Sequence, residues 1–199
     1  LRHYHQHCQQ LQQGSLGRPQ EFLPQPFRPY QPRLQRLLAE LRGEEPSENP
    51  PQPLKLPELV KKVEESCLVV LTGTGSGSGF VVSEDGLVAT NLHVILGARG
   101  IQLRQKRQGK FVSIPHVQVV LIDPVRDIAL LKVDARSHPL RPLRLGSAKN
   151  VQPAEDVVVI GNPGMMGRIL DYTITRGIVS NRDRLINGMH YIQTDAAVN

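Results

Sequence analysis

From residue 68 onward the chain consists largely of short runs of β-branched and other apolar residues, and this feature most limits what it can fold into. Gly, Pro, Asp or Asn separates one run from the next. Val, Ile and Thr fit the pleated surface of a sheet, and many short strands at such spacing are typical of a β-barrel or β-sandwich. The sequence therefore predicts an all-β fold. The expected strands are 68–71, 80–83, 87–90, 101–104, 117–122, 128–133, 157–160, 173–179 and 190–194.

Two local patterns add a hairpin and a helix to this prediction. Residues 84–86 read Glu-Asp-Gly between two of the expected strands. Gly86 takes a positive φ without steric cost, so a tight turn is expected there. A short helix is expected at 57–66, because Pro57 suits the first turn of a helix. Its inward-facing residues are expected to be Leu59, Val60 and Val63.

The N-terminal region, residues 1–53, has a different composition. It is rich in Gln, Pro and Arg and is expected to be a largely disordered tail and linker without a packed core. Within it, leucines at i, i+3, i+4 and i+7 predict one short amphipathic helix that ends near Gly43. Such a helix either packs on its own domain or contributes to contacts between subunits. The leucines of this stripe are Leu34, Leu37, Leu38 and Leu41.

Net charge and composition narrow the function classes. The 199 residues carry a formal net charge of +6, which permits binding to nucleic acid or to an anionic membrane surface. With only 4% aromatic residues and no zinc-knuckle spacing, the sequence offers no base-stacking platform, and no nucleic-acid partner is expected. A weaker alternative is RNA or DNA binding through the arginine-bearing tail. No run approaches the roughly 18 apolar residues of a membrane span.

Histidine and cysteine usage predicts neither a metal site nor a cofactor. His3, His5 and His7 lie together in the polar tail, but no carboxylate or second cluster completes a metal site there. Cys8 and Cys67 are too few and too differently placed for a disulfide framework. Cys67 lies in an apolar run and is expected to be a small core residue.

Three motifs that carry chemistry follow one another in the predicted β region. Residues 77–82 read Gly-Ser-Gly-Phe-Val-Val, residues 90–94 read Thr-Asn-Leu-His-Val, and residues 123–131 read Asp-Pro-Val-Arg-Asp-Ile-Ala-Leu-Leu. In these motifs and in their order, the sequence from about 56 to 199 resembles the HtrA (DegP-like) family of trypsin-like serine proteases. Four further segments are similar to the second barrel of that family: 145–147, 157–163, 175–180 and 191–197.

The resemblance implies a trypsin-like double β-barrel with a catalytic cleft between two six-stranded barrels. The first barrel is expected at 54–135, and a second barrel, incomplete at its C-terminal end, at 136–199. By the same resemblance, His93 is the general base of a catalytic triad and Asp127 is the carboxylate that orients it.

The chemistry of a serine protease needs these two residue types together. A serine hydroxyl is a weak nucleophile at neutral pH, so an imidazole must take its proton, and a buried carboxylate must hold that imidazole in the right tautomer. Taken singly, His93 reads as a surface or core residue and Asp127 as a turn residue, so only the motif order indicates catalysis. Asp123, the nearest competitor, precedes Pro124 and reads better as a turn former.

No serine in the sequence matches the family's nucleophile. That serine lies in a Gly-Asn-Ser-Gly-Gly segment shortly after the Thr-Asp-Ala-Ala run, and Asn199 comes a few residues before it. Residues 1–199 alone are therefore expected to be inactive. Ser76 and Ser78 lie in a glycine-rich run, but neither has glycines at both the −2 and +2 positions that a nucleophile elbow needs. This run is expected to be a flexible turn.

The resemblance implies a serine endopeptidase that acts in protein quality control on unfolded polypeptides, through an acyl-enzyme and without ATP, metal or another cofactor. The alternative is a truncated, inactive pseudo-protease that binds peptides or partner subunits. Trimeric relatives imply a homo-oligomer. The acid-poor, arginine-bearing start of the tail slightly favours a mitochondrial protein, with a secreted or periplasmic one as the alternative.

Overall fold

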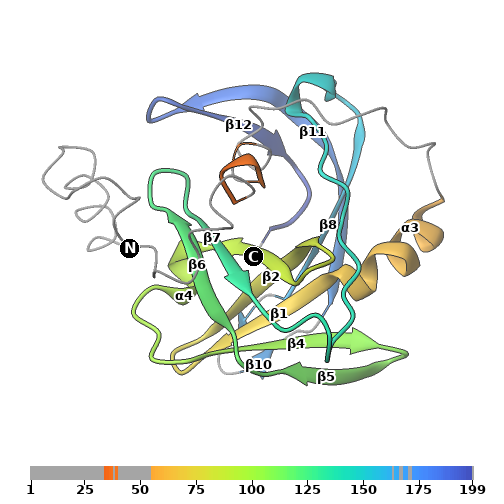
Figure 1. The fold of residues 1–199 in the computed structure, drawn as a ribbon. Coiled ribbons are helices and arrows are strands. Elements are labelled where there is room, and N and C mark those ends of the chain that lie inside the picture. The colour runs from red at the N-terminus through yellow and green to blue at the C-terminus, as the bar shows by residue number, and fades with distance from the viewer. Residues whose placement is uncertain are drawn as a thin grey trace, which may run out of the picture.

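The computed structural model describes residues 34–37, 39, 55–162, 164–165, 168–169 and 172–198. Half of these residues form β-strands, and the helices among them are short (Figure 1). Nearly all of the predicted tail, residues 1–53, lies outside the described residues. In the part of the chain that is described, no helix is both long and apolar enough to cross a membrane.

Seven antiparallel strands form the first sheet. Their order is β5-β4-β1-β2-β3-β7-β6, so most strands lie next to a strand that is their neighbour in the sequence. Such hairpin connections suit antiparallel pairs, because a short turn is enough to join them. The strands are β1 (Cys67–Thr72), β2 (Ser76–Ser83), β3 (Leu87–Asn91), β4 (Ile101–Arg107), β5 (Lys110–Ile114), β6 (Gln118–Asp123) and β7 (Ile128–Lys132).

Apolar residues that alternate along these strands point into one core. Leu68 on β1, Ile114 on β5 and Leu131 on β7 are all fully buried in the same cluster. Because β5 and β7 lie far apart in the sheet order, the sheet curls around this core like a barrel. Burying one such side chain contributes about 1.5–3 kcal/mol to the free energy of folding. The predicted all-β fold is confirmed.

Three further strands form a second sheet with the order β12-β11-β8. β11 extends well beyond the predicted strand 173–179, and its second half pairs with β12 across two bulges. The turn between them is built by Asn187 and Gly188, with φ angles of 52° and 77° that suit a tight hairpin. The strands are β8 (Asp156–Gly161), β11 (Thr173–Ile186) and β12 (Met189–Thr194), and a small pair consists of β9 (Gly164–Met165) and β10 (Arg168–Ile169).

From residue 55 onward, the helical elements in the described part of the chain are α3 (Leu56–Val63), η3 (Glu64–Ser66), α4 (Leu92–Ile95) and η4 (Ala148–Asn150). Together α3 and η3 confirm the helix predicted at 57–66. Its expected inward-facing residues, Leu59, Val60 and Val63, are half-buried and not part of a fully buried core. The predicted hairpin turn is also confirmed, with Gly86 at φ 95°.

Two details of the first sheet differ from the expectation. The resemblance implied six strands, and the additional one is β5, whose residues alternate poorly because only Ile114 is buried. The glycine-rich run was expected to be a flexible turn, but from Ser76 onward it belongs to β2 and pairs with β1. On its other side β2 pairs with β3, and Gly79 permits this close approach, since a Cβ there would lie 3.0 Å from the carbonyl oxygen of Ala89 on β3.

The described part of the predicted amphipathic helix, residues 34–37 and 39, packs on the first sheet. Residues 34–37 are helical, and Leu34 is only 2% exposed. Leu34 and Leu37 cover the outer face of the first sheet, where they contact a second apolar cluster that includes Val82 and Leu130. The other two leucines of the stripe, Leu38 and Leu41, lie outside the described residues.

We expect the Leu34→Ala variant to be less stable than the wild-type protein by about 2–3 kcal/mol, because the substitution removes a buried side chain and leaves a cavity above the sheet. The free energy of unfolding in urea measures this loss. Gln35→Ala is the matched control, since Gln35 lies on the exposed side of the same helix. Equal stability of the two variants would contradict the packing of this helix on the sheet.

Cys67 is a small core residue, as its apolar neighbours predicted. It is a free cysteine at the start of β1 and is buried. Burial, with a smaller contribution from the nearby charge of Glu64, raises the pKa of its thiol to about 11. At neutral pH the thiol is therefore protonated and a poor nucleophile. Cys8 lies outside the described residues.

Candidate active site

Neighbouring strands bring His93 and Asp127 together. β3 ends at Asn91, which pairs with Ile128 at the start of β7. His93 follows β3 in the single turn of α4, and Asp127 directly precedes β7. The Nδ1 atom of His93 lies 2.5 Å from the Oδ2 atom of Asp127. The structure thus brings the two sequence-predicted site residues into direct contact.

Backbone and side-chain donors fix the orientation of Asp127. Its Oδ1 atom accepts a hydrogen bond from the backbone N–H of His93 (2.8 Å), and its carbonyl oxygen accepts one from the N–H of Leu92 (3.1 Å). The Asn91 amide donates to the same carbonyl oxygen (3.1 Å) and to Oδ2 (3.3 Å). Asp127 has a left-handed φ of 58°, which non-glycine residues seldom adopt and which these bonds hold.

This arrangement selects one tautomer of His93. An ionised carboxylate only accepts hydrogen bonds, so the neutral imidazole carries its proton on Nδ1 where it meets Asp127. Its lone pair is then on Nε2, at the far side of the ring. With a side chain that is 58% exposed, His93 can receive a proton there from a group in the cleft.

Asp123 has the structural role that its position before Pro124 predicted. Its Oδ1 atom accepts hydrogen bonds from the backbone N–H groups of Val125 (3.1 Å) and Arg126 (3.2 Å), which closes an Asx turn. Asp123 is 4% exposed. The carboxylate that contacts His93 is therefore Asp127 and not Asp123.

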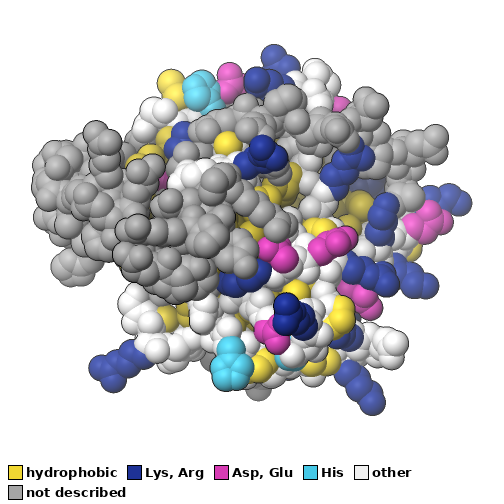
Figure 2. Space-filling model, in the orientation of Figure 1, with side chains coloured by type: hydrophobic (Ala, Val, Ile, Leu, Met, Phe, Trp, Pro, Cys, Tyr) yellow, Lys and Arg dark blue, Asp and Glu magenta, His cyan; other side chains and the backbone are white. Residues whose placement is uncertain are grey.

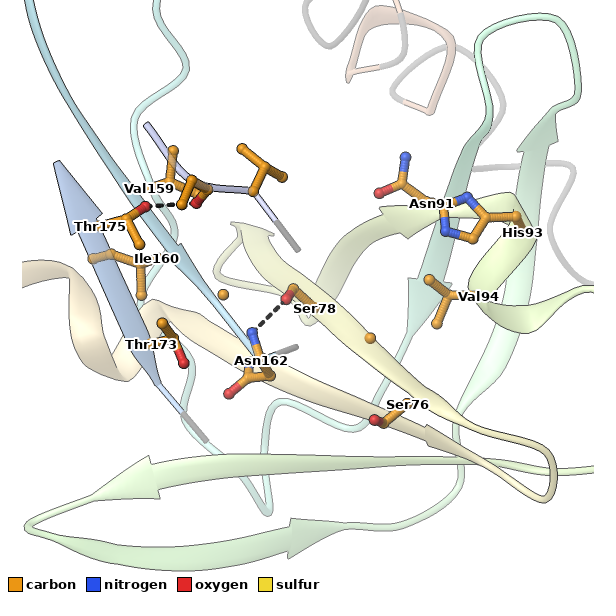
Figure 3. Close-up of a pocket in the computed structure, with 14 residues that line it drawn as sticks. Ser76, Ser78, Asn91, His93, Val94, Val159, Ile160, Asn162, Thr173 and Thr175 are labelled. Atoms are coloured by element: carbon orange, nitrogen blue, oxygen red, sulfur yellow. Dashed lines mark hydrogen bonds between the residues drawn. The ribbon is translucent and has the colours of Figure 1, made fainter. Parts of the chain in front are cut away.

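A cleft of about 370 Å³ separates His93 from the second sheet (Figure 3). On one side His93, Asn91 and Val94 extend from the end of β3 and from α4, and on the other side Thr173 and Thr175 extend from β11. The remaining lining residues are Ser76, Gly77, Ser78, Val159, Ile160, Gly161, Asn162, Ala197 and Val198.

Neither Ser76 nor Ser78 is bonded to His93, although both line the cleft. The Ser78 hydroxyl oxygen accepts a hydrogen bond from the backbone N–H of Asn162 (2.8 Å), on the opposite wall (Figure 3). Within the described ranges, no serine hydroxyl forms a hydrogen bond with the His93 ring. The hydroxyl of Ser78 is a link between the two sheets.

The end of the described chain is held beside the cleft by two side chains. The Thr175 hydroxyl donates to the carbonyl oxygen of Ala197 (2.8 Å). Asp195 accepts the backbone N–H of Ile178 through Oδ1 (2.7 Å). These bonds fix residues 195–198 along β11, so that Ala197 and Val198 line the cleft that contains His93.

Three residues of the site were not singled out from the sequence. Asn91 orients Asp127, and its position two residues before His93 in the Thr-Asn-Leu-His-Val motif was an available signal. Gly77 lies against Val94, and a Cβ there would come within 2.6 Å of Val94 Cγ2. Asn162 joins the two sheets, and nothing in its local sequence indicates this.

The described residues contain no group of three or more His, Cys, Asp or Glu side chains that could hold a metal ion. The histidines of the tail, His3, His5 and His7, for which no metal site was predicted, lie outside these residues. What the site contains is a carboxylate-oriented imidazole that faces a cleft, which is the arrangement of a general base.

Comparison with known proteins identifies the family. Residues 77–199 match the family described as "Trypsin-like peptidase domain". The chain is 40% identical over 126 residues to "Probable periplasmic serine endoprotease DegP-like" of Marinomonas sp. (strain MWYL1), which covers 62% of this chain and 25% of that protein. It is 38% identical over 130 residues to "Serine protease HTRA2, mitochondrial" of Bos taurus, in a match that covers 62% of this chain and 26% of that protein.

A third relative is "Protease Do-like 1, chloroplastic" of Arabidopsis thaliana, 36% identical over 160 residues, with 76% of this chain and 35% of that protein covered. The matched part of the chain thus spans about a quarter to a third of the length of these curated relatives.

Solved structures agree with these relatives. The crystal structure of Deg5 superposes with a TM-score of 0.61 at 30% identity, over 73% of this chain and 77% of that one. The structure described as "HtrA-type protease AlgW with tripeptide" gives the same TM-score and identity, over 73% of this chain and 48% of that one. The family match covers more than half of the residues, and the chain therefore belongs to the trypsin-like peptidases of the HtrA type.

Proposed function

We propose that this chain supplies the general base and the orienting carboxylate of a serine endopeptidase, with His93 and Asp127 in these roles. The observation that carries the proposal is the 2.5 Å contact between His93 Nδ1 and Asp127 Oδ2, in a ring that borders a cleft. Membership of the HtrA-type family supports it.

In the proposed reaction His93 first accepts a proton and then donates the same proton. Nε2 accepts the proton of the nucleophilic serine hydroxyl as its oxygen attacks the scissile carbonyl carbon. The imidazolium, stabilised by Asp127, then gives this proton to the leaving amine as the C–N bond breaks and the acyl-enzyme forms. Water hydrolyses the ester by the same route. The nucleophile is a serine that none of the described residues supplies.

The proposed substrates are unfolded polypeptides, and the proposed role is protein quality control without ATP, metal or cofactor. The names of the relatives, which are serine proteases, support the polypeptide substrate. We also propose a division into a first barrel at 54–135 and a second barrel at 136–199. A homo-oligomer and a mitochondrial location are further proposals. A secreted or periplasmic location is the alternative.

Replacement of His93 tests the proposed function. In the protein made from its complete coding sequence, we expect His93→Ala to abolish hydrolysis of unfolded casein, because no other described residue that lines the cleft has a basic side chain to take the serine proton. The rate of release of soluble peptides measures it. His138→Ala is the control, since His138 lies in the linker between the two sheets, away from the cleft. Hydrolysis at the wild-type rate by His93→Ala would refute the assignment.

The same experiment separates the two alternatives. If the wild-type protein keeps casein in solution without cutting it, the chain belongs to a binding protein of this family and not to a protease.

Nucleic-acid binding would require a basic surface. On the face in Figure 2, Lys and Arg side chains alternate with acidic ones and do not form one continuous stripe.

A further inference from the structure

Asn162 and Tyr172 flank the part of the chain that joins β8 to β11, and both are bonded to the first sheet. Asn162 is 1% exposed, and its side-chain amide donates to the carbonyl oxygen of Leu68 on β1 (3.1 Å). Its backbone N–H donates to Ser78 on β2 (2.8 Å). The Tyr172 hydroxyl donates to the carbonyl oxygen of Cys67, also on β1.

The two flanking residues also hold each other. The backbone N–H of Tyr172 donates to Oδ1 of Asn162 (2.9 Å), which closes a ring of bonds between β1, Asn162 and Tyr172. Every polar group of the Asn162 side chain is used in this ring. One side chain thereby satisfies a carbonyl of β1 and the N–H of the residue that directly precedes β11.

The ring of Tyr172 adds contacts with the hairpin of β4 and β5. Its centroid lies 5.9 Å from that of Phe111, and Nζ of Lys106 lies 5.1 Å from it. The Lys106 backbone N–H donates to the phenol oxygen (3.3 Å), so the hydroxyl acts as donor and acceptor at once. These contacts hold Tyr172 at a left-handed φ of 57°, which is rare for an aromatic residue.

The position of Tyr172 connects this set of hydrogen bonds between β1, Asn162 and Tyr172 to the cleft. The next residue, Thr173, pairs with Gly161 of β8, and both line the cleft opposite His93. Since Tyr172 is bonded to β1, it determines the position of Gly161 and Thr173 relative to the first sheet. His93 follows strand β3 of that sheet. Resting on the proposed function, we infer that Tyr172 is a positioning residue that fixes the width of the cleft and hence how tightly the enzyme holds a polypeptide substrate.

Replacing the hydroxyl alone tests this inference. Tyr172→Phe keeps the ring but loses both hydrogen bonds of the hydroxyl. In the protein made from its complete coding sequence, we expect KM for a peptide substrate to rise about three- to tenfold, because substrate binding must then restore a position of β11 that two internal hydrogen bonds held in the free enzyme. The kcat value should change less than twofold, because the lost binding is uniform between substrate and transition state. Tyr172→Ala should raise KM further.

Tyr191→Phe is the matched control, because the one hydrogen bond that the Tyr191 hydroxyl forms within the described residues goes to the Sδ atom of Met189 on its own strand. A role limited to stability would lower the fraction of folded enzyme, and with it the apparent kcat, and would leave KM unchanged. An unchanged KM in Tyr172→Phe, or the same kinetic change as in Tyr191→Phe, would overturn the inference.

A second measurement does not depend on hydrolysis. In the His93→Ala protein we expect trypsin to cut the Arg168–Ile169 bond, which lies between Asn162 and Tyr172, at least threefold faster with Tyr172→Phe than with Tyr191→Phe. Mass spectrometry measures the cut. If the wild-type protein hydrolyses no peptide, the proposed function fails and this assay alone decides the inference. Equal trypsin rates would then reject the inference. A faster cut in Tyr172→Phe would support the role of Tyr172 in holding this part of the chain against β1.

Discussion

Asp127→Asn is expected to lower kcat by about 10⁴-fold and to leave KM nearly unchanged, in the protein made from its complete coding sequence. The reason lies in the donors that surround this carboxylate. Its Oδ1 atom accepts the backbone N–H of His93, and its Oδ2 atom faces His93 Nδ1. An asparagine has only one acceptor oxygen, and the backbone N–H claims it.

The NH₂ group of that asparagine would then face Nδ1 of His93. Two donors repel each other, so Nδ1 must become an acceptor and the imidazole proton must move to Nε2. In this tautomer His93 has no lone pair toward the cleft and takes no proton from a serine. Asp127 lines no part of the cleft surface, so substrate binding should change little.

Asp123→Asn is the matched control for this experiment. Asparagine forms an Asx turn as readily as aspartate does, so the bonds from Val125 and Arg126 should persist and kcat should stay within about threefold of the wild-type value. Initial rates over a range of peptide concentrations separate kcat from KM. Comparable losses in the two variants would contradict the role proposed for Asp127.

Asn162→Ala is expected to lower the free energy of unfolding by about 2–6 kcal/mol. The substitution removes a buried side chain that accepts the Tyr172 N–H and donates to the Leu68 carbonyl oxygen. Each polar group left without a partner in the interior costs about 1–3 kcal/mol. Urea unfolding measures the loss.

Asn150→Ala provides the comparison, because Asn150 is exposed and its backbone N–H makes the turn bond of η4. We expect that variant to remain within about 0.5 kcal/mol of the wild-type stability. A small effect at Asn162 would mean that the two sheets are joined by other contacts, and it would also weaken the inference about Tyr172.

Local patterns in the sequence were sufficient for much of the fold. The β-branched runs predicted every strand of the first sheet except β5, and proline and glycine placed α3 and the turn at Gly86. These elements depend on residues close together in the chain. β5 was missed because a single buried residue, Ile114, does not produce an alternating pattern. The second half of β11 was missed for the same reason, since its side chains are exposed on both faces.

The sequence by itself determined the candidate pair His93 and Asp127, because their motifs stand in the order of a known family. Only the tertiary structure decided how Asp127 is oriented, where Leu34 packs, and that Asn162 and Tyr172 join the second sheet to β1. These contacts join residues far apart in the chain. A hydrogen bond of this kind depends on the relative position of two sheets, which is set by the packing of their cores and leaves no periodic signal in the sequence around either partner.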